Sequence, residues 1–404
     1  MDAWFQNEVT YPHVAPEVLN AADSVRATLP NKYCDPAISA NLFAEAIYEY
    51  LLCDDLGINV ICTEHHAGIN SLLASNPMLL AILAAQTKKV RILSLGTLIT
   101  LRPDPVRIAE EYATADVISR GRLEIGFVKS GLSEYASNQA SPIDNGDRYW
   151  EAIDLISKAL SHQEGVFSWE GKHFTHRHVN IWPRPYQPTL PRLWSATGDP
   201  STAGDVGRRD MVQVLVLRGP EGTKVAFAAN RSARASAGMP KATTDRFAYA
   251  ALLAVGDTHE EGVKMGEKLM WFLNTSLRSA PQFGTMLPGL APPHAAPGIY
   301  RTRPVATKPG ETASAAANAA ALMSITAEQA MARGILFAGS PDTIYKQIMD
   351  FHESVGGFDH LSMIGRSGFM THAETTKSMT LFGKEVLPRL KEVKTVTAGF
   401  NQTD

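Results

Sequence analysis

The sequence predicts one α/β domain spanning residues 1–404, a (β/α)8 TIM-type barrel with insertions. Runs of strand-forming residues alternate with helical patterns for most of the chain. Each strand run is apolar on both faces, as a parallel sheet covered by helices requires. Eight such units in a chain of 404 residues favour a closed barrel over an open, doubly wound sheet. No second domain is needed to account for the length.

Each expected element rests on a hydrophobic pattern and on the residues that bound it. Residues 59–63 (NVICT) are strand formers, whereas residues 38–56 repeat apolar side chains at three-to-four spacing and end at Gly57, a helix stop. The same criteria predict eight strands, at 3–5, 59–63, 90–98, 122–128, 192–196, 211–216, 247–255 and 358–364. They predict helices at 38–56, 77–86, 105–118, 150–161, 201–208, 221–238, 260–273, 341–354 and 373–390.

Three insertions interrupt this alternation. Residues 7–34 form a long insert after the first strand, and residues 166–179, with Gly171 at the turn, are typical of a β-hairpin. Residues 280–321 are rich in proline and end in an Ala/Ser-rich tail. A stretch that long without secondary structure is usually a lid or a binding loop. We therefore expect it to fold over one rim of the barrel.

Composition excludes several classes of protein. Lys and Arg number 38 against 41 Asp and Glu, a net charge of −3 that is too balanced for a nucleic-acid binder. No apolar run reaches the roughly 18 residues that span a bilayer, and the first residues do not resemble a signal peptide. The three cysteines lack CxxC spacing, which favours a reducing compartment. We expect a cytoplasmic enzyme without membrane or nucleic-acid partners.

Reactive groups of a barrel lie at the carboxyl ends of its strands, and two of these ends suggest an anion site. Residues 198–202 (GDPST) open a helix, where free N–H groups and the helix dipole favour a phosphate. Lys129, Ser130 and Gly131 end the neighbouring strand and supply a positive charge. The simpler interpretation of Asp199 and Ser201 is a helix N-cap. Residues 339–342 (GSPD) are a rival phosphate site, but an N-cap followed by proline explains them better.

Glu64, His65 and His66 follow the second strand directly. An imidazole at the rim can move protons near neutral pH, although a surface turn would explain the same residues equally well. His173, His176 and His178 are also closely spaced. In a hairpin His173 lies on the opposite face from the other two, and no carboxylate or cysteine completes a ligand set. We therefore expect no metal site.

Several segments, in this order, resemble one family. They are residues 61–66 (ICTEHH), 76–77 (NP), 90–97 (VRILSLGT), 105–111 (PVRIAEE), 119–126 (SRGRLEIG) and 339–342 (GSPD). Together they resemble the bacterial luciferase-like, flavin-dependent monooxygenases. The resemblance extends over nearly the whole chain, and the family fold is a (β/α)8 barrel with inserts.

The resemblance implies that reduced FMN lies at the carboxyl end of the barrel and reacts with O2 to give a flavin hydroperoxide. His65 matches the catalytic histidine of the family, and Lys129 matches an arginine that grips the flavin phosphate. Ser201 matches a hydroxyl at the end of the helix that binds the phosphate, and Gly198 lies just before this helix. Leu98 and Ile99 match a backbone stretch that lies under the isoalloxazine ring. The chain departs from the luciferase in two ways: Val128 replaces a cysteine near the flavin, and residues 129–131 contain one extra residue.

The favoured hypothesis is a two-component monooxygenase that receives reduced FMN from a separate reductase, because no GxGxxG motif follows a strand. Its substrate would be a small, uncharged or weakly polar organic molecule. A deazaflavin-dependent oxidoreductase on the same barrel and a non-catalytic flavin-binding subunit are the alternatives. The family resemblance also implies a homodimer. Apolar residues on two helices would supply its interface: Leu79, Leu80, Ile82, Leu83, Ile108 and Tyr112.

Overall fold

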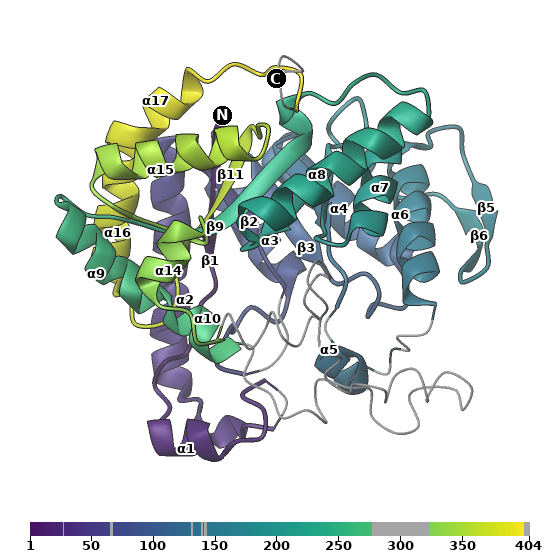
Figure 1. Cartoon of the computed structure of the whole chain (residues 1–404). Coiled ribbons are helices and arrows are strands. Elements are labelled where there is room, and N and C mark those ends of the chain that lie inside the picture. The colour runs from purple at the N-terminus through teal and green to yellow at the C-terminus, as the bar shows by residue number, and fades with distance from the viewer. Residues whose placement is uncertain are drawn as a thin grey trace, which may run out of the picture.

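The centre of the molecule is a closed barrel of eight parallel strands (Figure 1). The computed structural model describes residues 1–26, 28–64, 68–130, 132–138, 140, 144–276 and 323–399. In barrel order the strands are β1 (Asp2–Asn7), β2 (Asn59–Cys62), β3 (Ile92–Thr97), β4 (Leu123–Phe127), β7 (Leu193–Ala196), β8 (Val212–Val216), β9 (Phe247–Val255) and β11 (His360–Arg366). Pairing of β8 with β9 closes the ring. The structure confirms the predicted (β/α)8 barrel.

A ninth strand, β10 (Leu336–Gly339), was not predicted. It pairs in parallel with the carboxyl-terminal half of β9, beyond the point where β8 ends. The N–H of Leu217 donates to the carbonyl of Ala250, and the N–H of Leu252 donates to the carbonyl of Ile335. Because residues two apart on a strand use the same edge, β10 continues the position of β8 along β9. A four-residue strand beside a longer partner leaves little sequence signal.

Most of the predicted helices begin and end close to the predicted residues, whereas the short α-helices at 16–21, 132–137 and 327–332 were not predicted. Their bounds are α1 (Pro16–Ala21), α2 (Pro36–Leu56), α3 (Asn76–Gln86), α4 (Pro105–Ser119), α5 (Leu132–Ser137), α6 (Asn145–Ser161), α7 (Pro200–Arg208), α8 (Gly219–Ser236), α9 (His259–Leu269), α10 (Trp271–Ser276), α14 (Ala327–Ala332), α15 (Pro341–Ser354), α16 (His372–Leu381) and α17 (Leu387–Lys391). The hairpin predicted at 166–179 is present as β5 (Phe167–Glu170) and β6 (Thr175–Val179). No helix in the described part of the chain is both long and apolar enough to cross a bilayer.

Two helices differ from the prediction. The helix expected at 260–273 is divided into α9 and α10. The helix expected at 373–390 is interrupted by a π-helical turn, Phe382–Val386, before α17. Pro388 explains the second interruption, because proline has no N–H for the preceding turn and its ring crowds that turn. The predicted lid, residues 280–321, lies outside the described residues.

Strands β3 and β4 approach each other closely at two glycines. A Cβ on Gly126 would lie 2.7 Å from the carbonyl oxygen of Ser94, and a Cβ on Gly96 would lie 2.6 Å from the carbonyl oxygen of Gly126. Both are too short for a real side chain, so only glycine fits at either position. This contact holds in place the start of the segment that carries Leu98 and Ile99.

The amino-terminal end of the barrel is closed by aromatic and charged side chains. Trp4 and Trp194 meet edge to face at 5.2 Å, and His360 lies beside both rings. The N–H of Trp4 donates to Nδ1 of His360 at 3.4 Å, so Nε2 must carry the proton that reaches the Asp245 carbonyl at 3.1 Å. Arg192 approaches the same ring at 3.2 Å. His360 is therefore neutral, and a second proton would be repelled.

We expect the stability of the protein to fall as the pH drops below about 6.5. Burial, followed by the charges of Arg192 and Arg91, holds the pKa of His360 well below its ordinary value of 6.5. Below that value the unfolded chain binds a proton that the folded chain cannot, so the free energy of unfolding falls by up to about 1.4 kcal/mol per pH unit. Chemical denaturation of the wild type and His360→Gln between pH 7 and 5 measures this.

The substitution His360→Gln should lower by about one the number of protons that the protein takes up on unfolding at acidic pH. His352→Gln is the control. Burial also lowers the pKa of His352, so this variant should lose only the pH dependence that His352 contributes and should keep that of His360. Parallel stability curves for wild type and His360→Gln would show that His360 takes no part.

Candidate functional site

The polar segments predicted from sequence meet at one rim of the barrel. β2, β3, β4 and β7 are consecutive neighbours in the sheet, and their carboxyl ends lie at the same edge because the strands are parallel. Leu98 and Ile99, which follow β3, are 3% and 0% exposed. His65 and Gly131 lie outside the described residues, so the structure places neither of them.

Lys129, two residues after the end of β4, reaches the start of α7. Its Nζ donates to Oγ1 of Thr202 at 3.2 Å and lies 5.3 Å from the centre of the Tyr149 ring. Partial burial lowers the pKa of Lys129, and the nearby carboxylates of Asp199 and Asp205 oppose this effect. The strand end and the helix start that the sequence analysis paired are therefore in contact.

The start of α7 is capped by Asp199. The Asp199 carboxylate accepts hydrogen bonds from the Ser201 hydroxyl at 2.5 Å, the Thr202 N–H at 2.9 Å and the Thr202 hydroxyl at 3.0 Å. These bonds, that of Ser201 first, lower the pKa of Asp199. The N-cap interpretation is confirmed. An anion at this helix start would have to take the place of Asp199 or share its donors.

The sequence analysis missed a second cation, Arg218, which follows β8. A Cβ on Gly198 would lie 3.3 Å from Nε and 3.4 Å from Cζ of Arg218, so the guanidinium lies over the backbone of Gly198. Within the described residues no carboxylate pairs with Arg218. Its position just beyond the predicted strand at 211–216 could have revealed it by the strand-end rule. Cationic side chains from two different strand ends thus reach the segment 198–202: Arg218 lies at Gly198, and Lys129 contacts Thr202.

Ser130 belongs to a small cluster of hydroxyls. Its Oγ lies 3.0 Å from Oγ1 of Thr100, which in turn lies 3.2 Å from the hydroxyl of Tyr135. Tyr135 is on α5 and is 2% exposed. The cluster joins the ends of β3 and β4 to this short helix. Ser130 is therefore bonded toward α5, whereas Lys129 is bonded toward α7.

Glu64, after β2, is a buried carboxylate at the same rim. It is 6% exposed, and the N–H of Leu98 donates to its Oε2 at 3.3 Å. Burial raises the pKa of Glu64, while this hydrogen bond and the charge of Arg102 act in the opposite direction. Thr63 directly follows β2, and its hydroxyl is buried without a partner among the described residues.

A charged network at the rim fastens β1 and β11 to the helices. Glu49, fully buried on α2, accepts hydrogen bonds from Asn7 at 2.6 Å and Arg366 at 2.7 Å, and lies 2.9 Å from Nδ1 of His372. Arg366 also binds Glu45 at 2.7 Å. Burial raises the pKa of Glu49, and Arg366 and His372 oppose that rise. The network sets the position of the chain as it enters the first insert.

The fold and this rim define a (β/α)8-barrel protein whose polar, cation-bearing groups lie at the carboxyl ends of the strands, where barrel enzymes hold their sites. Residues 35–357 match the family model of the luciferase-like monooxygenases. The chain belongs to this family, as the sequence motifs indicated.

A curated relative is the flavin-dependent trigonelline monooxygenase, oxygenase component, of Acinetobacter baylyi. It is 31% identical over 172 residues, which are 42% of this chain and 47% of the relative. The match thus spans about half the length of that protein.

Two solved structures share the fold. One is the oxygenating constituent of 3,6-diketocamphane monooxygenase from Pseudomonas putida, a type II Baeyer–Villiger monooxygenase in complex with FMN. Its TM-score is 0.70 at 18% identity, over 96% of this chain and 98% of that chain. The other is an F420-dependent secondary alcohol dehydrogenase in complex with an F420–acetone adduct. Its TM-score is 0.61 at 15% identity, over 85% and 94% of the two chains.

Proposed function

We propose that this protein is the oxygenase component of a two-component, flavin-dependent monooxygenase. It takes reduced FMN from a separate reductase and oxygenates a small organic substrate with O2. Family membership and the trigonelline monooxygenase relative support this proposal. The structural observation that carries it is the approach of Lys129 and Arg218, from two strand ends, to Gly198 and the start of α7.

The residues at the rim fit FMN. A phosphate carries up to two negative charges, and two cations from different strands can offset these charges, while the neighbouring Asp199 carboxylate adds one negative charge beside them. Gly198 offers backbone without a side chain between them, and Thr202 adds a hydroxyl. The buried segment at Leu98 and Ile99, which carries apolar side chains, would lie under the flavin ring. Thr63 offers a buried hydroxyl that has no partner among the described residues.

When bound, reduced FMN supplies the electrons and the reaction with O2. The chain positions the flavin and keeps water away from it, because water would divert the reaction to peroxide. Glu64 holds the N–H of Leu98 and so orients the backbone at the flavin ring. His65 is proposed to exchange protons with the reacting groups, as an imidazole does near neutral pH.

A deazaflavin-dependent oxidoreductase, which transfers hydride without oxygen, is the second candidate. The shared fold of the F420-dependent alcohol dehydrogenase favours it. The affinities of the purified protein for reduced FMN and for reduced F420 separate the two: preference for FMN with oxygen consumption supports the monooxygenase.

We predict that reduced FMN binds at least tenfold more tightly than reduced riboflavin, and that Lys129→Ala removes most of this difference. A charge-assisted hydrogen bond is worth about 1.5–3 kcal/mol, which corresponds to roughly a tenfold change or more. Anaerobic titration with both flavins is the measurement. Arg218→Ala should act in the same way. Lys224→Ala is the control, since Lys224 pairs with Glu221 on the surface of α8. Equal affinities for the two flavins would place the phosphate elsewhere.

A second prediction concerns His65. His65→Ala should leave FMN affinity within a few-fold and lower product formation by about 10²–10⁴, the usual contribution of general acid–base catalysis. Oxygen consumption should continue as uncoupled peroxide release, which a peroxide assay detects. His66→Ala serves as the control. Full coupled turnover by the His65 variant would remove His65 from the mechanism.

We also propose a homodimer, through a surface that differs from the one first expected. Leu79, Leu80, Leu83, Ile108 and Tyr112 are buried in the core and cannot form an interface, and Ile82 is half-buried. These side chains face the barrel because α3 and α4 pack on it. A groove of about 340 Å³ instead has an apolar side made of Pro77, Ala81, Ala115, Ile118 and Trp182, and a polar side made of Arg107, Glu110, Glu111 and Thr114. Trp182 is 84% exposed. A second copy of the chain is the proposed occupant.

Ile118→Glu should convert this dimer to a monomer at micromolar concentration, because it would bury a third carboxylate in a groove that already holds Glu110 and Glu111. Sedimentation velocity measures the change. Val225→Glu is the matched control: Val225 is exposed on α8, and it does not line the groove. A wild-type protein that sediments as a monomer would contradict the proposal.

A further inference from the structure

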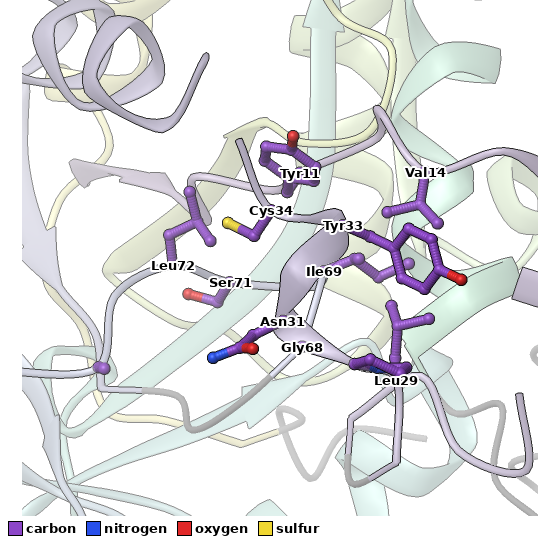
Figure 2. A pocket seen from close by; sticks show the side chains of 12 residues that line it. Tyr11, Val14, Leu29, Asn31, Tyr33, Cys34, Gly68, Ile69, Ser71 and Leu72 are labelled. Carbon is purple, nitrogen blue, oxygen red and sulfur yellow. The ribbon is translucent and has the colours of Figure 1, made fainter. Parts of the chain in front are cut away.

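A pocket of about 230 Å³ lies between the insert after β1 and the segment that follows β2 (Figure 2). The insert contributes one group of lining residues and the segment 68–74 contributes the other. Together they are Tyr11, Val14, Leu29, Pro30, Asn31, Tyr33, Cys34, Gly68, Ile69, Ser71, Leu72 and Ala74. None of the flavin-site residues proposed above belongs to this set, so the pocket is a separate feature of the structure.

The lining of the pocket is uncharged and mainly apolar. Tyr11 is 2% exposed and is held in place because its hydroxyl accepts the N–H of Asp35 at 2.8 Å. Figure 2 shows the branched side chains of Val14, Ile69 and Leu72 with it around the pocket. A charged ligand would lose its hydration here without gaining a counter-charge, which costs several kcal/mol. The lining therefore selects a neutral molecule.

One corner of the pocket is polar. Asn31 and Ser71 lie on the same side in Figure 2. The Ser71 hydroxyl oxygen accepts the N–H of Leu73 at 3.2 Å, and within the described residues its proton is given to no acceptor. The Asn31 side chain is exposed at the rim. This corner can donate hydrogen bonds to one oxygen atom of a ligand.

The inner wall of the pocket is the segment that leaves β2. Gly68 (φ +82°) is pressed against the insert, since a Cβ there would lie 2.1 Å from the carbonyl oxygen of Val25. Asn70 lies between Ile69 and Ser71 but does not line the pocket; it is 1% exposed, and its amide has no partner among the described residues. The segment 68–74 follows β2 in the sequence, and residues 65–67, which include His65, lie between the two and outside the described residues.

We propose that this pocket binds the organic substrate, and that the substrate is a neutral, mostly apolar molecule with one carbonyl or hydroxyl oxygen. This inference rests on the proposed function. The volume is below the roughly 300–1,000 Å³ of sites for drug-sized ligands, so the ligand is small. The pocket has no cation for a phosphate, so FMN does not compete for it.

Cys34 allows a direct test, because it is the one cysteine of the three that is not buried. Burial raises the pKa of both Cys53 and Cys62 and keeps their thiols unreactive. Iodoacetamide should therefore alkylate Cys34, and Cys34→Ser should abolish the labelling. Saturating cyclohexanone should slow the alkylation at least threefold, whereas cyclohexanecarboxylate should have no effect.

Two variants at exposed positions complete the test. Ala74→Trp fills the pocket from its rim, and Asn31→Asp places a charge at the polar corner; both should abolish protection by cyclohexanone. Equal protection by the carboxylate, or none by cyclohexanone, would overturn the inference. Titration of the same samples with reduced FMN distinguishes this result from failure of the proposed function. If FMN binds and cyclohexanone does not protect Cys34, the pocket does not bind the substrate and the proposed function stands. If cyclohexanone protects Cys34 and FMN does not bind, the pocket binds a neutral ligand and the proposed function is wrong.

Discussion

Closure of a parallel barrel is the constraint on which the other features of this protein depend. The pairing of β8 with β9 completes a ring in which every strand runs in the same direction. All segments that leave the strands must then meet at one rim, however far apart they lie in sequence. Lys129, Gly198 and Arg218 come from three different strand ends and are brought together for this reason. The ring must also be filled, and Trp4, Trp194 and His360 fill its amino-terminal end.

The charges of the structure are divided between two ends with different tasks. At the amino-terminal end, charged groups are paired in a buried setting; Glu124, for example, accepts hydrogen bonds from Arg91 and from Trp194 at 2.5 Å. At the carboxyl rim, Lys129 and Arg218 remain partly open to solvent, as a site for an anionic ligand needs. Asp199 lies beside these two cations. Its carboxylate caps α7, and its negative charge lowers the positive electrostatic potential that a phosphate would meet.

Features that depend on residues close together in sequence, such as the bounds of strands and helices and their caps, could be predicted, and several of these predictions are confirmed. The strand 247–255 and the helix 341–354 have the bounds that the patterns indicated, and Ser340 caps that helix ahead of Pro341 as expected. The prediction of which residues form the dimer interface was wrong. A helical apolar pattern shows which side chains share a face, but it does not show whether that face packs inward or outward. Ser201 is intermediate: the N-cap geometry is confirmed, while a phosphate contact stays a proposal.

The sequence by itself determined the alternation of strands and helices, the family and the strand ends at which polar groups lie. These depend on local periodicity, on caps and on short motifs, which any single stretch of chain carries. Only the tertiary structure decided that β10 continues β8 along β9, that Arg218 lies over Gly198, and that Arg366 neutralises Glu49 across a separation of 317 residues. It alone decided that the insert after β1 meets residues 68–74 around an uncharged pocket. Such contacts arise because burial and barrel closure bring distant segments together, and no local pattern records which segments those will be.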